Sequence, residues 1–293
     1  MTDPITFAFF GTSHIAVFVL DELEKASLMP AIIVTVPAKP RGRGLAVSET
    51  PVARWGRERG IPVSETWDEF ERGSWDAAVV VDYGKILPAR LLSIPRRGFL
   101  NVHPSLLPRF RGPSPIRSAI LAGDSTTGVT VMLLDDAMDH GPVIAQKRIE
   151  LSDPPPRNSE LERILMPAGG ALLAQMLPRW IAGDIEATPQ NHDVATYCQK
   201  FTKEDGALDL SGDARFNLLK IRAFEGWPGT FAFFERAGKR LRVQILEAHL
   251  EQGALAIDYV KPEGKGVMNY ADFARSGARP VQPTAPSEGD ASR

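Results

Sequence analysis

The sequence predicts an α/β fold in which a mostly parallel sheet is followed by a small, separate β-barrel. An apolar run at 5–10, a helical segment and a β-branched run at 31–36 follow one another, as in a βαβ unit. Two further apolar runs, 77–81 and 98–102, have the length and composition of buried strands. Beyond residue 230 the pattern changes to short strands joined by turns, which is typical of a small barrel.

Capping residues and proline positions predict the helices of the first part. Ser13 can cap a helix over 14–25, and Pro51 suits the first turn of a helix that ends near Arg59. The Pro and Gly content of 37–44 predicts a loop. The remaining expected elements are helices at 114–122 and 159–181 and strands at 128–134 and 142–149.

A polar stretch after Gly183 separates the two parts. We expect a helix at 214–224 and strands at 230–235, 240–250 and 254–260. The predicted organisation is a catalytic domain at 1–190, a linker at 191–206, a barrel domain at 207–279 and a disordered tail at 280–293, which is rich in Pro, Ser, Gly and Ala.

Composition excludes several classes of protein. The 293 residues carry a net charge of −2, which argues against indiscriminate nucleic-acid binding but leaves room for a local basic face. No run reaches the roughly 18–20 apolar residues of a membrane helix, and the N-terminus does not read as a signal peptide. The single cysteine, Cys198, fits a reducing cytoplasm and can be either a nucleophile or an ordinary thiol. Because no Cys/His cluster has ligand spacing, we expect no metal site.

Three polar residues at predicted strand ends suggest a site for acyl chemistry. Asn101 and His103 close the strand at 98–102 within Asn-Val-His-Pro-Ser-Leu-Leu-Pro-Arg-Phe-Arg-Gly, and Asp139 lies on a tight turn before Gly141. In open α/β sheets, ligands bind at the carboxyl ends of the strands. An amide, an imidazole and a carboxylate together can steady an oxyanion and accept a proton. Each residue alone can equally be a turn residue bonded to local backbone.

The motif as a whole resembles the formyltransferases that use 10-formyltetrahydrofolate. Four segments carry the resemblance in the same order: the motif at 101–112, then Pro115-Ile116, Gly128-Val-Thr130 and Asp139-x-Gly141. Further similarities, closest to the methionyl-tRNA formyltransferase family, lie at 9–12, 37–44, 79–88, 195–205 and 222–228. The resemblance implies a Rossmann-like domain followed by an OB-like barrel. No G-x-G-x-x-G pattern is present, so we do not predict NAD.

The resemblance also implies roles for individual residues. Asn101 would hydrogen-bond the formyl oxygen, His103 would stabilise the oxyanion and move protons, and Asp139 would orient His103 and accept a proton. Ser105 lacks a nucleophile elbow, so no covalent intermediate is expected. The folate co-substrate would be held by two segments, whose residues are Tyr83, Gly84, Lys85, Ile86 and Leu87, together with Ser105, Leu106, Leu107 and Pro108.

The expected acceptor is initiator methionyl-tRNA, bound by a monomeric, cytoplasmic enzyme. The basic residues expected to bind RNA are Lys39, Arg41 and Arg43 in the predicted loop. A second basic set, Lys239, Arg240 and Arg242, can bind RNA or can equally be a solvent-exposed face with no partner. The strands at 240–250 and 254–260 follow one another almost directly, so the barrel must be reduced or open. Three alternatives remain open. They are a formyltransferase acting on a sugar amine or other small amine, a formyltetrahydrofolate hydrolase, and a non-enzymatic binding protein.

Two positions depart from the family pattern. Asp82 stands where the family has a small residue, and its carboxylate either faces solvent or meets a donor of the pterin. His140 stands where the family has Thr, and is either a surface turn residue or an added proton-active group.

Overall fold

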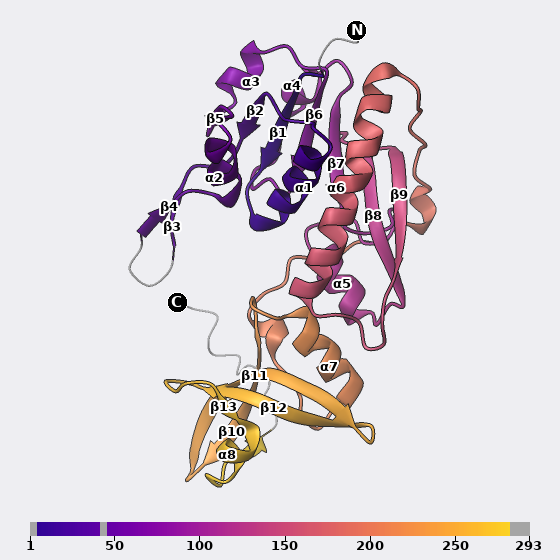
Figure 1. The fold of residues 1–293 in the computed structure, drawn as a ribbon. Helices are drawn as coiled ribbons and strands as arrows, with labels where there is room; N and C mark the ends of the chain where they lie inside the picture. Colours follow the sequence, from indigo (N-terminus) through magenta and orange to yellow (C-terminus); the bar gives the residue numbers. More distant parts are fainter. Residues whose placement is uncertain (1–4, 42–45, 282–293) are drawn as a thin grey trace. The chain divides into compact units, whose positions relative to one another are not determined.

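The computed structural model describes residues 5–41 and 46–281 (Figure 1). The chain divides into two compact units by contact. The first contains Met1–Pro115, Thr126–Glu150 and Leu161–Cys198, and the second contains Ile116–Ser125, Leu151–Glu160 and Gln199–Arg293. The predicted fold class is confirmed, because a mostly parallel sheet lies in the first unit and an antiparallel sheet in the second.

The sheet of the first unit has seven strands in the order β5-β2-β1-β6-β7-β8-β9. Its strands are β1 (Phe7–Gly11), β2 (Ile32–Val34), β5 (Val63–Ser64), β6 (Ala77–Val81), β7 (Phe99–His103), β8 (Thr126–Leu133) and β9 (Val143–Glu150). Pairing is parallel from β5 to β7 and antiparallel from β7 to β9. Because β2 and β6 flank β1 on opposite sides, the strand order reverses there, and ligands of open α/β sheets bind at such a point.

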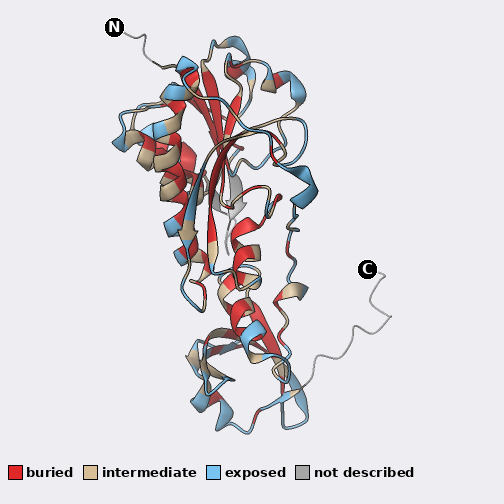
Figure 2. Cartoon of the chain, turned by 90° about the vertical axis from the view of Figure 1, so that its right-hand side faces the viewer, coloured by how far each residue is buried: buried red, intermediate tan, exposed pale blue. Residues whose placement is uncertain are grey.

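Helices cover the central strands, whose residues are buried throughout (Figure 2). The helices here are α1 (His14–Lys25), α2 (Pro51–Glu58), α3 (Asp68–Arg72), α4 (Ala89–Leu92) and α6 (Asn158–Ala182). The Ser13 hydroxyl caps α1 by accepting from the Ile15 amide at 3.3 Å, as predicted. Leucines of α1 and α6 share one core cluster with β1, whereas Phe10 and Phe70 pack together on the opposite face of the sheet at 4.9 Å between ring centroids.

The prediction of a loop at 37–44 was wrong in part. Strand β3 (Lys39–Arg41) pairs antiparallel with β4 (Ala46–Ser48), so the segment enters a two-stranded ribbon. A ribbon outside the main sheet tolerates Pro40, whose missing N–H would disrupt a central strand. Composition predicted only a loop, because each of these short strands forms only by pairing with the other.

The second unit contains a five-stranded antiparallel sheet in the order β13-β12-β11-β10-β14. Its strands are β10 (Thr230–Arg236), β11 (Lys239–Glu251), β12 (Ala254–Pro262), β13 (Met268–Asn269) and β14 (Arg279–Val281), and its helices are α5 (Pro115–Leu121), α7 (Ala214–Ala223) and α8 (Tyr270–Ala274). A single 3₁₀ turn occurs at Glu204–Gly206 in this unit, and another at His192–Val194 in the first unit. Phe234, Val243 and Phe273 form part of the core beneath this sheet. β12 begins three residues after β11 ends, so no further strand lies between them, as expected for a barrel with fewer strands.

Part of the predicted disordered tail is a strand. Pro280 and Val281 belong to β14, where they pair with Phe234 and Phe233 of β10. A strand of three residues that contains proline carries little signal of its own, so its pairing with β10 creates it. The rest of the predicted tail lies outside the described residues. The domain boundaries at 190 and 206 stay predictions, although residues 191–198 pack with the first unit.

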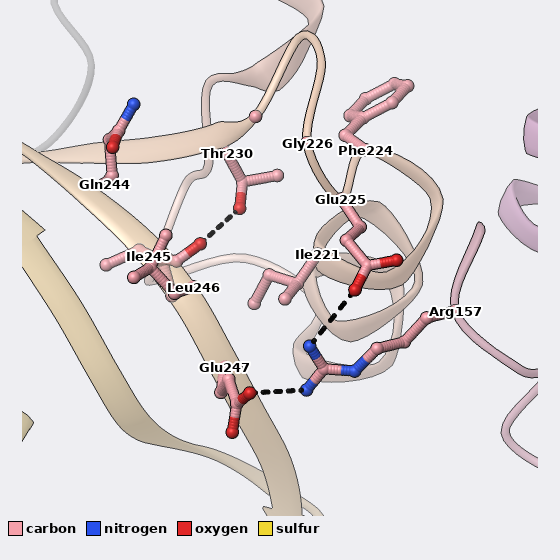
Figure 3. Close-up of a pocket in the computed structure, with 11 residues that line it drawn as sticks. Arg157, Ile221, Phe224, Glu225, Gly226, Thr230, Gln244, Ile245, Leu246 and Glu247 are labelled. Carbon is pink, nitrogen blue, oxygen red and sulfur yellow. Dashed lines mark hydrogen bonds and ion pairs between the residues drawn. The ribbon is translucent and has the colours of Figure 1, made fainter. Parts of the chain in front are cut away.

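An ion-pair cluster lines a hollow of about 270 Å³ in the second unit (Figure 3). The guanidinium of Arg157 lies 3.8 Å from the carboxylate of Glu225 and 3.5 Å from that of Glu247. The cluster connects the segment before α6 with the end of α7 and with β11. All three side chains are partly exposed, so the pairs orient these segments more than they stabilise them.

Candidate active site

Asn101 and His103 lie on β7, between a parallel and an antiparallel neighbour. Asn101 pairs with Val80 of β6 and with Met132 of β8, and His103 pairs with Thr130 of β8. Two residues apart on one strand, both side chains point to the same face of the sheet. The structure therefore brings Asn101 and His103 to one face, near the carboxyl end of β7, as the sequence predicted.

The ring of His103 is held by a backbone carbonyl. Its Nε2 lies 3.0 Å from the oxygen of Phe110, and a carbonyl only accepts, so Nε2 carries a proton. Its Nδ1 lies 3.7 Å from Oδ1 of Asp139, which is an ion-pair distance and too long for a hydrogen bond. The expectation that Asp139 orients His103 is therefore not met by a direct hydrogen bond. Phe110 makes that contact, with its backbone in the left-handed region at a φ of 58°.

Asp139 is largely buried and is fixed by a backbone amide. The Gly112 N–H donates to Oδ2 of Asp139 at 2.7 Å, which leaves Oδ1 directed toward His103. Gly112 has a φ of 114°, and a Cβ there would lie 2.5 Å from the carbonyl oxygen of Cys198. Only glycine fits this position without strain. The last residue of the 101–112 motif therefore allows the backbone to bring its N–H to the Asp139 carboxylate.

A hollow of about 590 Å³ connects Asn101 and Asp139 with the predicted folate segment, whereas His103 is not among the described residues that line it. Its lining includes Asn101 and Asp139, and from the predicted folate residues Tyr83, Lys85, Ile86 and Leu87. The rest of its lining is Val80, Asp82, Ala89, Leu92, Leu134, Asp135, Asp136, Ala137 and Met138. Residues of 80–92, Asn101 and residues of 134–139 thus form one concave site with apolar walls and a few polar groups, the usual character of a small-molecule site.

The 82–87 segment is anchored at its start and open beyond it. The indole N–H of Trp67 donates to the Tyr83 hydroxyl at 2.9 Å, and burial raises the pKa of that hydroxyl. The amide of Gly84 donates to Oγ1 of Thr12 at 3.0 Å. Ile86 is 92% exposed, so an apolar side chain at the hollow is free to cover a ligand. Asp82 is exposed and also lines the hollow, so its carboxylate can meet both solvent and a ligand donor.

The second predicted folate segment, Ser105–Pro108, occupies a different place. The Thr130 hydroxyl donates to the Ser105 carbonyl at 2.6 Å and accepts from the Leu107 amide at 3.1 Å. Leu106 packs against Gly128 of β8. None of the four residues is among the described residues that line the hollow. Their backbone is tied to β8, so they shape the turn that leads from His103 to Gly112.

Comparisons with known proteins identify the family. The formyl transferase family model matches residues 5–176, more than half of the chain. The chain belongs to the formyl transferase family. A methionyl-tRNA formyltransferase of Chloroflexus aggregans is 39% identical over 243 residues, covering 80% of this chain and 78% of the relative. One of Myxococcus xanthus is 36% identical over 293 residues, covering 90% and 93%.

The fold recurs in a solved structure of an N-formyltransferase from Helicobacter canadensis, in complex with folinic acid and dTDP-3-aminofucose. The TM-score is 0.64 at 17% identity, covering 87% of this chain and 94% of that one. At this identity the likeness concerns the fold alone.

Two histidines of this formyl transferase stack beside the Asp139 turn. The rings of His140 and His192 are parallel within 2°, with centroids 4.0 Å apart. Nδ1 of His140 lies 2.6 Å from Oδ2 of Asp135. His140 therefore packs on a second histidine and contacts Asp135, and among the described residues it makes no contact with His103. Sequence reasoning missed His192, because nothing local links it to residues 135–140.

The predicted RNA-binding cations divide into two groups. Lys39 and Arg41 lie in β3, and Arg43 lies outside the described residues. In the second unit, the guanidinium of Arg240 lies 3.8 Å from the ring centroid of Phe233, and that of Arg242 lies 3.8 Å from that of Phe231. No helix in the part of the chain that the structure describes is long and apolar enough to cross a membrane.

Proposed function

We propose that this formyl transferase moves the formyl group of 10-formyltetrahydrofolate to the amino group of methionyl-initiator tRNA. The observation that carries the proposal is the shared hollow, in which Asn101 and Asp139 lie with Tyr83, Lys85, Ile86 and Leu87. A site for a flat, partly apolar co-substrate thus adjoins groups suited to acyl chemistry. The sequence identity to methionyl-tRNA formyltransferases favours a tRNA acceptor.

The reaction requires an oxyanion stabiliser and a proton acceptor. A neutral amine attacks the formyl carbon, the carbonyl oxygen becomes negative, and the amine then loses a proton while the folate nitrogen leaves. We assign the amide of Asn101 to the formyl oxygen. Loss of one such donor typically raises the barrier by about 3–4 kcal/mol.

The proton path follows from the tautomer of His103. With Nε2 donating to Phe110, the free position of the neutral ring is Nδ1, which faces Asp139. Nδ1 can take the proton of the attacking amine directly or through water, and the Asp139 carboxylate at 3.7 Å would then stabilise the imidazolium. Gly112 holds the carboxylate in place during this step.

For the co-substrate, we propose that Tyr83–Leu87 contribute backbone groups and that Ile86 and Leu87 contribute apolar contacts. The exposure of Ile86 supports this, since a bound ring would cover it. Ser105–Pro108 would act indirectly, by shaping the turn after His103.

For the tRNA, we propose two basic surfaces. One comprises the cations of the 37–44 segment, Lys39 and Arg41 of β3 together with Arg43, which lies outside the described residues. The other is a face of the second sheet, where the strand register aligns aromatic and basic side chains. The aromatic and basic members of that face are Phe231, Phe233, Arg240, Arg242, Lys261 and Arg279, and the acidic Glu235 lies on it opposite both Arg240 and Arg279. Cations interleaved with aromatic rings suit a phosphate backbone and its bases.

An acceptor competition tests the function. Purified enzyme with 10-formyltetrahydrofolate is offered charged initiator tRNA, a sugar amine and water, and formation of each product is followed. The proposal expects consumption of the tRNA at least a hundredfold faster than the others. Faster use of the sugar amine would favour the second candidate, a sugar-amine formyltransferase. Use of water alone would indicate a hydrolase.

Variants test the site itself. Asn101→Ala, His103→Ala and Asp139→Ala should each lower turnover at least about a hundredfold with the fold retained, because they act on one transition state. Near-normal turnover in any two would refute the assignment. The same proposal includes action as a monomer in the cytoplasm, which gel filtration and cell fractionation would check.

A further inference from the structure

A single amide clamps both ends of the Asp139 turn. The Nε2 group of Gln190 donates to the Asp139 carbonyl at 2.9 Å and to the Gly141 carbonyl at 2.7 Å. Gln190 is only 7% exposed, so these bonds form away from solvent. Asp139 has a φ of 51°, and a Cβ at Gly141 would lie 2.0 Å from the Leu133 oxygen. The turn is thus tight, and Gln190 connects its two sides.

A buried arginine determines which way the Gln190 amide points. Oε1 of Gln190 accepts from Nε of Arg111 at 3.1 Å and from Nη2 at 2.7 Å. Because a guanidinium only donates hydrogen bonds, the oxygen of the Gln190 amide must face Arg111. The NH₂ group of the same amide must therefore face the turn. Two bonds accepted and two donated use the full capacity of the Gln190 side chain.

Arg111 makes these contacts without an acidic partner. It is 1% exposed, and within the described residues it contacts no carboxylate. Its other side-chain contacts are Nδ1 of His192 at 2.8 Å and the Tyr197 hydroxyl at 3.2 Å. Taking an uncompensated cation out of water is costly, so its hydrogen bonds to neutral acceptors must hold it there. A buried guanidinium that costs this much free energy is consistent with a role in which the direction of its hydrogen bonds matters.

We propose that Gln190 is a positioning residue that holds the Asp139 carboxylate opposite His103, and that Arg111 fixes the orientation of the Gln190 amide. The inference rests on the proposed catalytic role of Asp139. It adds a residue 51 positions away from Asp139 that contacts the backbone of the turn and does not line the hollow. The competing explanation is that Gln190 only satisfies the buried charge of Arg111, which would stabilise the fold without acting on turnover.

Replacing one atom of Gln190 separates the two explanations. Gln190→Glu keeps acceptors for Arg111 but places a carboxylate oxygen against the two carbonyls of the turn, which repels them. Gln190→Met removes all four hydrogen bonds at similar volume. We expect Gln190→Met to lower both the melting temperature and kcat. Gln190→Glu should recover most of the melting temperature lost in Gln190→Met, while its kcat stays at least tenfold below wild type and KM for the folate changes less than about threefold. Recovery of both stability and kcat would overturn the proposal.

A further variant covers the case in which Gln190→Glu does not fold. Gln190→Asn keeps the amide but is shorter by one methylene, so it cannot reach both Arg111 and the turn, and we expect a kcat at least fivefold below wild type. Wild-type kcat in this variant would overturn the proposal even if Gln190→Glu does not fold.

Asp139→Asn, alone and with Gln190→Glu, separates the inference from the proposed function. The double variant should match Asp139→Asn within about threefold, because both changes act through one carboxylate. Normal turnover of Asp139→Asn refutes the proposed role of Asp139. A large loss in Asp139→Asn beside normal kcat in Gln190→Glu refutes only the role of Gln190.

Discussion

Thr130→Val should destabilise the first unit although it changes almost no volume. Thr130 is fully buried, and its hydroxyl donates to the Ser105 carbonyl at 2.6 Å. It also accepts from the Leu107 amide at 3.1 Å and from Nε2 of Gln146 at 2.9 Å. Valine removes all three bonds, while Gln146 keeps its bond to the Leu107 carbonyl at 2.8 Å.

At about 1 kcal/mol for each hydrogen bond lost, the free energy of unfolding should fall by about 3 kcal/mol. For a unit of this size the melting temperature should drop by roughly 6–12 °C, which scanning calorimetry measures. Turnover should fall as well, because the turn held by Thr130 follows His103 directly.

Thr127→Val is the matched control, since it makes the same chemical change at a buried position of the same strand. Among the described residues, no hydrogen bond to the Thr127 side chain is present, so its change should stay within about 0.5 kcal/mol. A loss below 1 kcal/mol in Thr130→Val, or a loss equal to that of the control, would refute the assigned role of the hydroxyl network.

Three more outcomes are expected. Gly112→Ala should lower kcat at least tenfold, because a Cβ would lie 2.5 Å from the Cys198 oxygen and displace the amide that holds Asp139; unchanged kcat contradicts this. A backbone N–H and Arg96 hold the pKa of Asp76 below its ordinary value of 3.8, so its ionised form contributes stability above that value and loses it as pH falls through the lowered pKa. The melting-temperature gap between wild type and Asp76→Asn should therefore be full at pH 6 and close below pH 3.8; a constant gap would exclude ionisation as its source. A reduced-folate analogue at a hundred times its Kd should stabilise the protein by about 2.7 kcal/mol, whereas stabilisation by NAD instead would remove the folate assignment.

Local signals in the sequence were enough to predict much of the first unit. The helix over His14–Lys25 and the strand Ala77–Val81 were predicted at their observed bounds, because a capping serine and a continuous apolar run act within a few residues. The same kind of pattern predicted a strand at 98–102 containing Asn101, and the structure extends that strand by one residue to include His103. Family resemblance added the pairing of these residues with Asp139, which no local pattern contains.

Short elements depended on partners elsewhere in the chain. The two-residue strand β5 forms only against β2, and β14 forms only against β10. Neither has enough residues for its own propensity to outweigh the entropy of ordering. Each is stabilised by hydrogen bonds to a strand that is already in place.

The working geometry of the site also came from tertiary structure. The sequence indicated that His103 and Asp139 belong together, but the Phe110 carbonyl orients the ring and the Gly112 amide holds the carboxylate. The turn beneath Asp139 is closed by Gln190, far along the chain. Such contacts have no periodicity, because each joins a donor to an acceptor that folding brings within 3 Å, and burial rather than local propensity makes the pairing necessary.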